Sequence, residues 1–221
     1  MKEKLANFWY YHKWHLLVAV FLVAVIVVCV VQTCRHTGHD YTLMYAGPKT
    51  LATPDVSQLC ATVSDIAAKA EGAEKTTELH HYYVNLSPGN TSGGVTHQNL
   101  ENFDNEILAG QAIILLISPT LYDRVMESNG GLLPLDAYIP ADTDPAAFYD
   151  DTHYALKLSA LDLYTAPGFS SLPEDTLLCL RTSVSVTGLF QKKKSEEAHL
   201  AYQRLFYALV DRKTEPQTAD Q

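Results

Sequence analysis

Six small or polar residues follow predicted strands, and their types and spacing suit the binding of a small ligand. They are Gly47, Ser87, Asn90, Thr91, Ser118 and Thr120. In an open α/β sheet, ligands bind beyond the carboxyl ends of the strands. Backbone N–H groups of a helix that begins after Ser118 would suit a carboxylate or a phosphate. For Ser118 we favour the alternative of ordinary helix capping, worth about 1 kcal/mol. For residues 87–94 a flexible surface loop is an equally good explanation.

The histidines and acidic residues form no pattern typical of catalysis or metal binding. His80 and His81 would point to opposite faces of a strand, so they cannot bind one metal ion together. Asp150 and Asp151 precede His153, but a solvated loop before a strand is by far the better explanation of this group. Nucleophile-elbow, zinc-protease, P-loop and dinucleotide motifs are absent from the sequence. We therefore expect a protein that is not an enzyme and has no metal site and no cofactor.

The elements that must position the strand-end residues alternate between strands and helices. Apolar runs predict strands at 41–46, 81–86 and 112–117. Helical periodicity predicts a helix after each of them. The first begins with Thr53 as N-cap, the second runs from about 98 to 109 with Gly110 as C-cap, and the third has Ser118 as N-cap. This order predicts a parallel sheet flanked by helices.

Two further strands and one helix complete the predicted domain. Residues 154–163 and 176–184 are expected to form an antiparallel pair, and 195–210 an amphipathic helix. We therefore predict an α/β fold with one parallel or mixed sheet over residues 41–211. The tail at 212–221 is expected to be disordered.

An uninterrupted apolar run near the N-terminus predicts a transmembrane helix. Residues 16–31 contain no charge, Gly or Pro, and flanking Trp14, Gln32 and Thr33 extend the run to the roughly 17–20 residues that cross a bilayer. We predict a helix at 14–33 in contact with membrane lipid, and a linker at 34–40. A cleaved signal peptide is the alternative, but the run is long and lacks a small-residue cleavage site.

The charges around this run predict its orientation. Lys2, Lys4 and Lys13 precede the run, with Glu3 as the one acid there, so residues 1–13 are expected in the cytoplasm and the domain outside the cell. The chain has 16 Lys and Arg against 25 Asp and Glu. This acidic balance argues against a nucleic-acid partner.

Two cysteines, Cys60 and Cys179, lie in the region that we expect to be exported. An exported compartment permits a disulfide between them. Two buried free cysteines fit the sequence equally well, because spacing alone does not establish the geometry of a disulfide.

Two segments resemble extracellular solute-binding proteins of bacteria. In Asn105–Pro119 (NEILAGQAIILLISP) a helix, a glycine and an apolar strand follow one another, and Gly131–Ile139 (GLLPLDAYI), which follows Leu121 and Tyr122, is similar to the G-x-L-x-P-L-D-x-Y run of those proteins. The resemblance implies a periplasmic-binding-protein-like fold with a ligand cleft. The chain has room for one lobe, however, and Gln111 replaces an acidic residue common in the family. It is thus similar to single-lobe, one-pass membrane proteins of Gram-positive bacteria, and closure of two lobes around a solute is not expected.

These observations predict a single-pass membrane protein that is not an enzyme and presents one α/β lobe outside the cell. We expect it to interact with a transporter or another envelope protein. Such a role requires an exposed apolar patch, for which the candidates are Leu132, Leu133, Tyr138 and Ile139. The alternative is a minimal solute-binding protein, which requires a concave small-molecule pocket at the strand ends.

Overall fold

The computed structural model divides the chain into two units, Met1–Gly38 and His39–Gln221. The described residues are 39–87, 93–110, 112–128, 131–182 and 192–212, together with Trp14, Val18, 20–23 and Val25. Those in the first unit are helical and have exposed side chains. Most of the predicted transmembrane helix at 14–33 therefore lies outside the described residues. Within the described part of the chain, no helix has both the length and the apolar character to cross a membrane.

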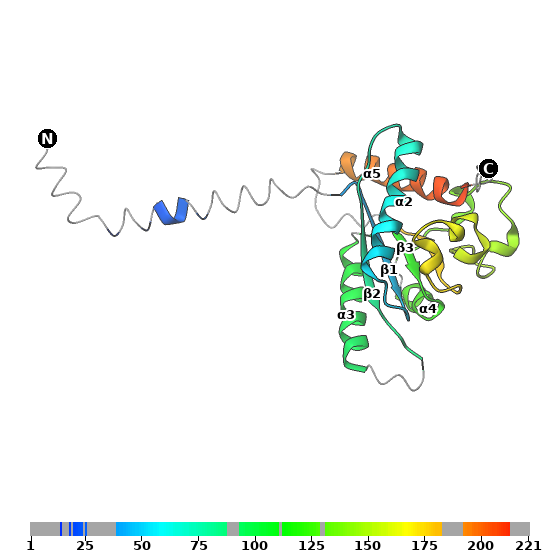
Figure 1. The fold of residues 1–221 in the computed structure, drawn as a ribbon, viewed down its shortest axis with the longest axis horizontal. Helices are drawn as coiled ribbons and strands as arrows, with labels where there is room; N and C mark the ends of the chain where they lie inside the picture. Colours follow the sequence, from blue (N-terminus) through cyan, green and yellow to red (C-terminus); the bar gives the residue numbers. More distant parts are fainter. Residues whose placement is uncertain are drawn as a thin grey trace, which may run out of the picture. The chain divides into compact units, whose positions relative to one another are not determined.

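The second unit is built on a five-stranded mixed sheet with the strand order β2-β1-β3-β5-β4 (Figure 1). Its strands are β1 Tyr41–Gly47, β2 Thr77–Tyr83, β3 Ile114–Ile117, β4 Ala155–Lys157 and β5 Leu177–Leu180. Strand β1 pairs in parallel with β2 and β3, and β5 pairs antiparallel with β3 and β4. The prediction of an α/β fold is confirmed, and the sheet is mixed because the chain returns through β5.

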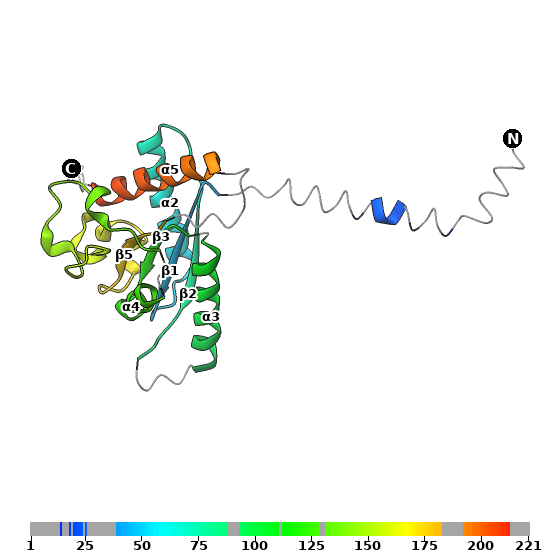
Figure 2. The ribbon, with the colours of Figure 1, turned by 180° about the vertical axis from the view of Figure 1, so that it is seen from behind.

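Helices cover both faces of this sheet (Figure 1, Figure 2). On one face, α2 (Thr53–Glu71) and α5 (Lys192–Val210) pack over Leu43 and Tyr45 of β1. On the other face, α3 (Gly93–Ala109) and α4 (Pro119–Glu127) pack over Met44 and Ala46. Successive strand residues point to opposite faces, so each apolar strand supplies both layers of the core.

Several predicted boundaries are shifted in the structure. Strand β2 begins four residues before the predicted strand at 81–86, because Tyr41 of β1 pairs with Thr77. Helix α3 begins before residue 98, and α5 before 195. Thr53 is the first residue of α2 and Ala52 its N-cap, so the predicted cap was wrong by one residue.

The predicted strand at 154–163 is confirmed only at Ala155–Lys157, where it pairs antiparallel with β5 as predicted. The chain continues in short 3-10 turns at Leu158–Ala160 and Asp162–Thr165. These turns bury Leu158, Leu161 and Leu163 in the core, and therefore the same apolar residues that suggest a strand are satisfied by a turning chain.

The predicted apolar patch is not exposed. Its four residues are half-buried: Leu133, Tyr138 and Ile139 pack against one core layer and Leu132 against the other. A 3-10 turn at Leu135–Ala137 folds this segment onto the domain, with Leu135 fully buried. This expectation was therefore wrong.

Candidate functional site

The structure brings some of the predicted strand-end residues together. The Ser118 N–H donates to the Ala46 carbonyl at 3.1 Å, and the Gly47 carbonyl accepts from the Val84 N–H at 2.8 Å. The carboxyl ends of β2, β1 and β3 therefore lie together at one end of the sheet, as the predicted parallel order requires. Ser87 is exposed and its N–H donates to the Asn85 side chain at 3.0 Å.

The remaining predicted site residues differ in their outcome. Asn90 and Thr91 lie outside the described residues. Ser118 occupies the N-cap position of α4, as predicted, but its side chain caps no helix N–H. Its hydroxyl instead contacts the Thr120 hydroxyl at 3.1 Å. The capping that we favoured for Ser118 is thus correct in position and wrong in the expected hydrogen bond.

The strand ends are filled by protein side chains. Gly47 and Ser118 are both buried, and a Cβ added to Gly47 would lie 2.7 Å from the Tyr45 hydroxyl. A cavity of about 180 Å³ lies elsewhere, where the loop at 140–144 approaches the C-terminal end of α5. Its lining includes Asp142, Asp144 and Asp162.

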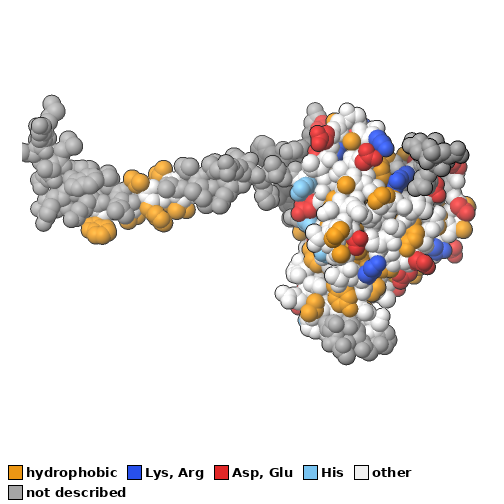
Figure 3. Space-filling view, in the orientation of Figure 1, with side chains coloured by type: hydrophobic (Ala, Val, Ile, Leu, Met, Phe, Trp, Pro, Cys, Tyr) orange, Lys and Arg blue, Asp and Glu red, His pale blue; other side chains and the backbone are white. Residues whose placement is uncertain are grey.

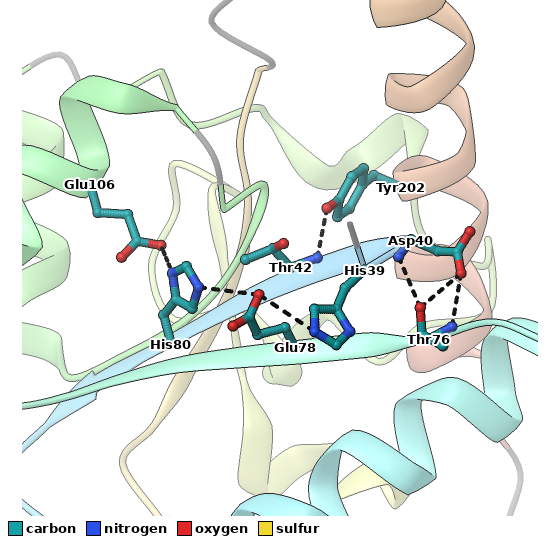
Figure 4. A network of polar contacts seen from close by, with 8 residues as sticks. All are labelled: His39, Asp40, Thr42, Thr76, Glu78, His80, Glu106 and Tyr202. Atoms are coloured by element: carbon teal, nitrogen blue, oxygen red, sulfur yellow. Dashed lines mark hydrogen bonds and ion pairs between the residues drawn. The ribbon is translucent and has the colours of Figure 1, made fainter. Parts of the chain in front are cut away.

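A row of alternating carboxylates and imidazoles runs along β2, and Figure 4 shows it from close by. The buried Glu106 of α3 contacts His80 Nδ1 through Oε1 at 2.6 Å. His80 Nε2 lies 3.6 Å from Glu78 Oε2, and His39 Nε2 lies 3.9 Å from the same oxygen. The row thus leads from a buried carboxylate to two exposed residues at the surface.

Glu106 has two hydrogen-bond partners although only 7% of its surface is exposed. Besides His80, the Tyr82 hydroxyl donates to its Oε2 at 2.5 Å. Burial and this carboxylate raise the pKa of Tyr82, so Tyr82 remains a donor. Burial lowers the pKa of the neighbouring Arg181, while the charge of Glu106 opposes that effect. A buried carboxylate of this kind is stable only with such partners.

In this row only the contact between His80 and Glu106, at 2.6 Å, is a hydrogen bond, whereas Glu78 lies at the longer ion-pair distances of 3.6 and 3.9 Å from the two imidazoles. In the part of the chain that the structure describes, no three His, Cys, Asp or Glu side chains lie where they could hold a metal ion. His80 and His81 point to opposite faces of β2, as predicted, and His81 is exposed.

A second polar network fastens the amino end of β1 to its neighbours (Figure 4). Asp40 Oδ2 accepts from the Thr76 N–H at 2.9 Å, which is the main reason that the pKa of Asp40 lies below its ordinary value. Tyr41 donates to Glu71 Oε1 at 2.5 Å, and Lys75 Nζ lies 2.9 Å from Glu71 Oε2. Burial tends to raise the pKa of Glu71, but these two partners lower it below its ordinary value.

Asp150 and His153, which lie close together in the sequence, make hydrogen bonds to other parts of the domain. Asp150 Oδ2 accepts from the Tyr122 hydroxyl at 3.1 Å, and its Oδ1 accepts from the Thr152 N–H at 3.0 Å. His153 contacts Asp136 at 2.7 Å and stacks on Phe148. These contacts fasten the segment before β4 to α4 and to the turn at Leu135–Ala137.

Cys60 and Cys179 are free cysteines. Cys60 packs against the core layer beneath α2 and α5, whereas Cys179 belongs to the layer beneath α3 and α4. Burial raises the pKa of both thiols, so each is held in its protonated form.

The outer side of β2 forms an edge of the sheet. The Val84 N–H donates to the Gly47 carbonyl, and even-numbered residues of β2 therefore direct their backbone groups towards β1. Odd-numbered residues direct theirs away from the sheet. We call this the β2 edge; it consists of the outward backbone groups of Thr77, Leu79 and His81.

Some backbone groups on the outer side of β2 are in contact with side chains of the neighbouring helices. After His81, the Tyr83 carbonyl accepts from the Asn99 side chain of α3 at 2.9 Å. At the centre of the β2 edge, the Cys60 thiol contacts the Leu79 backbone. Within the β2 edge, the outward backbone N–H and C=O groups of Thr77 and His81 have no hydrogen-bond partner among the residues that the structure describes. Figure 3 shows histidine and acidic side chains side by side at one margin of the domain.

Neither the row along β2 nor the β2 edge was predicted from the sequence. Only the alternation in Glu78, His80 and Tyr82 places three polar side chains on one face, and that pattern does not indicate Glu106 as their partner.

Comparisons with protein-family models, curated proteins and solved structures found no match for this chain. The resemblance to solute-binding proteins therefore rests on the sequence segments quoted above. What the fold establishes is a globular α/β domain with a five-stranded mixed sheet and helices on both faces.

Proposed function

We propose that this protein is a membrane-anchored interaction module that presents its α/β domain outside the cell and binds another protein through the β2 edge. It is not an enzyme. The observation that carries the proposal is the pair of outward backbone groups at Thr77 and His81, which find no partner within the described residues. Such an edge is a template for a further strand.

The anchor and the orientation are supported by the sequence. The apolar run at 16–31 and the lysines that precede it favour a single span, with the N-terminus inside and the domain outside. A partner in the envelope, such as a transporter, would then meet the domain next to the membrane surface.

A solute-binding role is supported less well. It requires a concave pocket at the strand ends, where Gly47 and Ser118 are buried against neighbouring side chains. The cavity of about 180 Å³ has a lining rich in Asp but lies away from these residues.

Site-specific photocrosslinking in intact cells tests the proposed function. A photoreactive residue at the exposed His81 should give a discrete adduct with a protein, because the edge would lie against its partner. The same residue at Asp65, which is exposed on α2, serves as the control and should give none. No adduct from position 81, or equal adducts from both positions, would contradict the proposed function.

A further inference from the structure

We infer that the partner at the β2 edge is a second copy of this chain, with the two β2 strands paired antiparallel about Leu79. This inference rests on the proposed function and names the partner. A twofold pairing of this kind presents the same surface from both copies and closes on itself. It would join the two sheets into one and give hydrogen-bond partners to the outward groups of Thr77 and His81 in both copies.

The backbone permits this register. Antiparallel strands exchange two hydrogen bonds between residues whose backbone groups face each other. With Leu79 opposite the partner's Leu79, His81 lies opposite the partner's Thr77. The outward groups of these residues are those that lack partners within the described chain.

The side chains favour the same register. When Leu79 faces its counterpart, Glu78 lies opposite the partner's His80, and the pair occurs twice by symmetry. These are non-hydrogen-bonded pairs, in which side chains approach most closely, and a carboxylate opposite an imidazole is a complementary pair because the carboxylate accepts hydrogen bonds and an imidazole N–H donates them. Glu78 is exposed and His80 half-buried, and both point to the face covered by α3.

The neighbouring registers that keep outward groups facing each other are unfavourable. A shift in one direction places Glu78 opposite the partner's Glu78, and a shift in the other places His80 opposite the partner's His80. Two carboxylates directly opposite each other repel and destabilise a strand pair, and two facing imidazoles leave the Glu78 carboxylates of both copies without an imidazole across the pairing. Of these three registers, only the one centred on Leu79 is complementary.

The first test changes one outward N–H without touching the ladder to β1. His81→Pro removes that N–H, while the bonds to β1 come from even-numbered residues, and Pro is tolerated on the open side of an edge strand. By symmetry the dimer would lose two hydrogen bonds, so its dissociation constant should rise about 30-fold. His81→Ala removes the side chain but keeps the N–H, and it should leave the dimer largely intact.

Sedimentation velocity of the full chain in detergent measures this difference, and circular dichroism checks that each variant is folded. A folded wild-type chain that remains monomeric would overturn the inference. So would a dimer that His81→Pro does not weaken.

A second test reads the register directly. Cys29, Cys34 and Cys60 are first replaced by Ser, and Thr77→Cys and His81→Cys are then made separately. In the proposed register the two new cysteines face each other at about 5.5 Å between Cα atoms, a separation suited to a disulfide. Mild oxidation should therefore crosslink a mixture of the two variants and leave each variant alone uncrosslinked. Crosslinking of either variant alone would overturn this register.

The photocrosslinking at position 81 separates the two proposals. An adduct of twice the mass of the chain supports the β2 edge as the binding surface and a second copy of the chain, rather than a transporter, as its partner. An adduct with a different protein keeps the proposed function and overturns the dimer, and the absence of any adduct overturns both.

Discussion

At the scale of single residues, the unusual feature of the domain is a carboxylate placed inside it. Glu106 lies between a helix and an edge strand, and its partners are His80 and Tyr82. Burial of a charge is costly without such partners, so this cluster acts as a polar fastener between α3 and β2. The same cluster holds Glu78 and His80 in place on the strand that we propose as the binding edge.

Glu106→Gln tests the fastener. The amide keeps the shape of the side chain but removes the charge that His80, Tyr82 and Arg181 face, so we expect a loss of about 1–3 kcal/mol in the free energy of unfolding. Urea unfolding followed by circular dichroism measures it. Glu101→Gln, an exposed change on the same helix, should stay within about 0.5 kcal/mol. An equal loss in the free energy of unfolding from both changes would show that the contacts of Glu106 do not stabilise the packing of α3 on β2.

The acid sensitivity of the domain should arise in part from Glu71. Its pKa in the folded protein lies below the ordinary value of 4.5, owing to Tyr41 and Lys75, which outweigh the effect of burial. Stability from such a group is complete above the ordinary value and is lost as the pH falls through the lower folded value. Glu71→Gln should therefore destabilise the protein at pH 7 and make little difference near pH 2.

Urea unfolding at the two pH values measures this effect, and Glu74→Gln at an exposed position nearby is the control. A penalty from Glu71→Gln that is the same at both pH values would contradict the argument.

At the scale of elements, the sequence predicted best those strands and helices that have a clear apolar pattern or a clear helix start. Strand β3 and helix α4 were predicted because an apolar run buried on both faces is followed by a Ser-Pro helix start. Strand β2 was misplaced because an edge strand has little apolar character: Glu78 and His81 are exposed, and these residues resemble a loop. The meeting of Gly47 and Ser118 followed from strand order alone.

The contact between His80 and Glu106 could not be predicted in this way. It depends on the register between β1 and β2 and on the placement of α3 over β2. Both are set by packing over residues far apart in the sequence, whereas periodicity reports only on neighbours within one element.

One glycine shows how closely the elements are packed. Gly168 has φ of 83°, and a Cβ added to it would lie 2.3 Å from the Leu59 nitrogen of α2. Gly168→Ala combines backbone strain with a clash and should cost about 2–4 kcal/mol of stability. Gly72 has φ of 73° but open space around it, so Gly72→Ala should cost only about 1 kcal/mol. Thermal unfolding that ranks the two variants equally would contradict the close packing of α2 on this turn.

At the scale of the whole molecule, the proposed role depends on which side of a membrane the domain occupies. The chain has a formal net charge of −9, yet its first 13 residues carry Lys2, Lys4 and Lys13 against one acid. An anchor at 14–33 would hold these lysines at the cytoplasmic surface, where anionic lipids attract them. The acidic domain would then stand on the opposite side.

Cysteine labelling in intact cells tests this orientation. In a chain with Cys29, Cys34 and Cys60 replaced by Ser, Asp65→Cys places a thiol on an exposed position of α2. A maleimide that does not cross membranes should label it at once, because the domain would face the medium. Lys4→Cys should be labelled only after the cells are permeabilised. Labelling of position 4 in intact cells, with position 65 protected, would reverse the orientation and place the β2 edge among cytoplasmic partners instead.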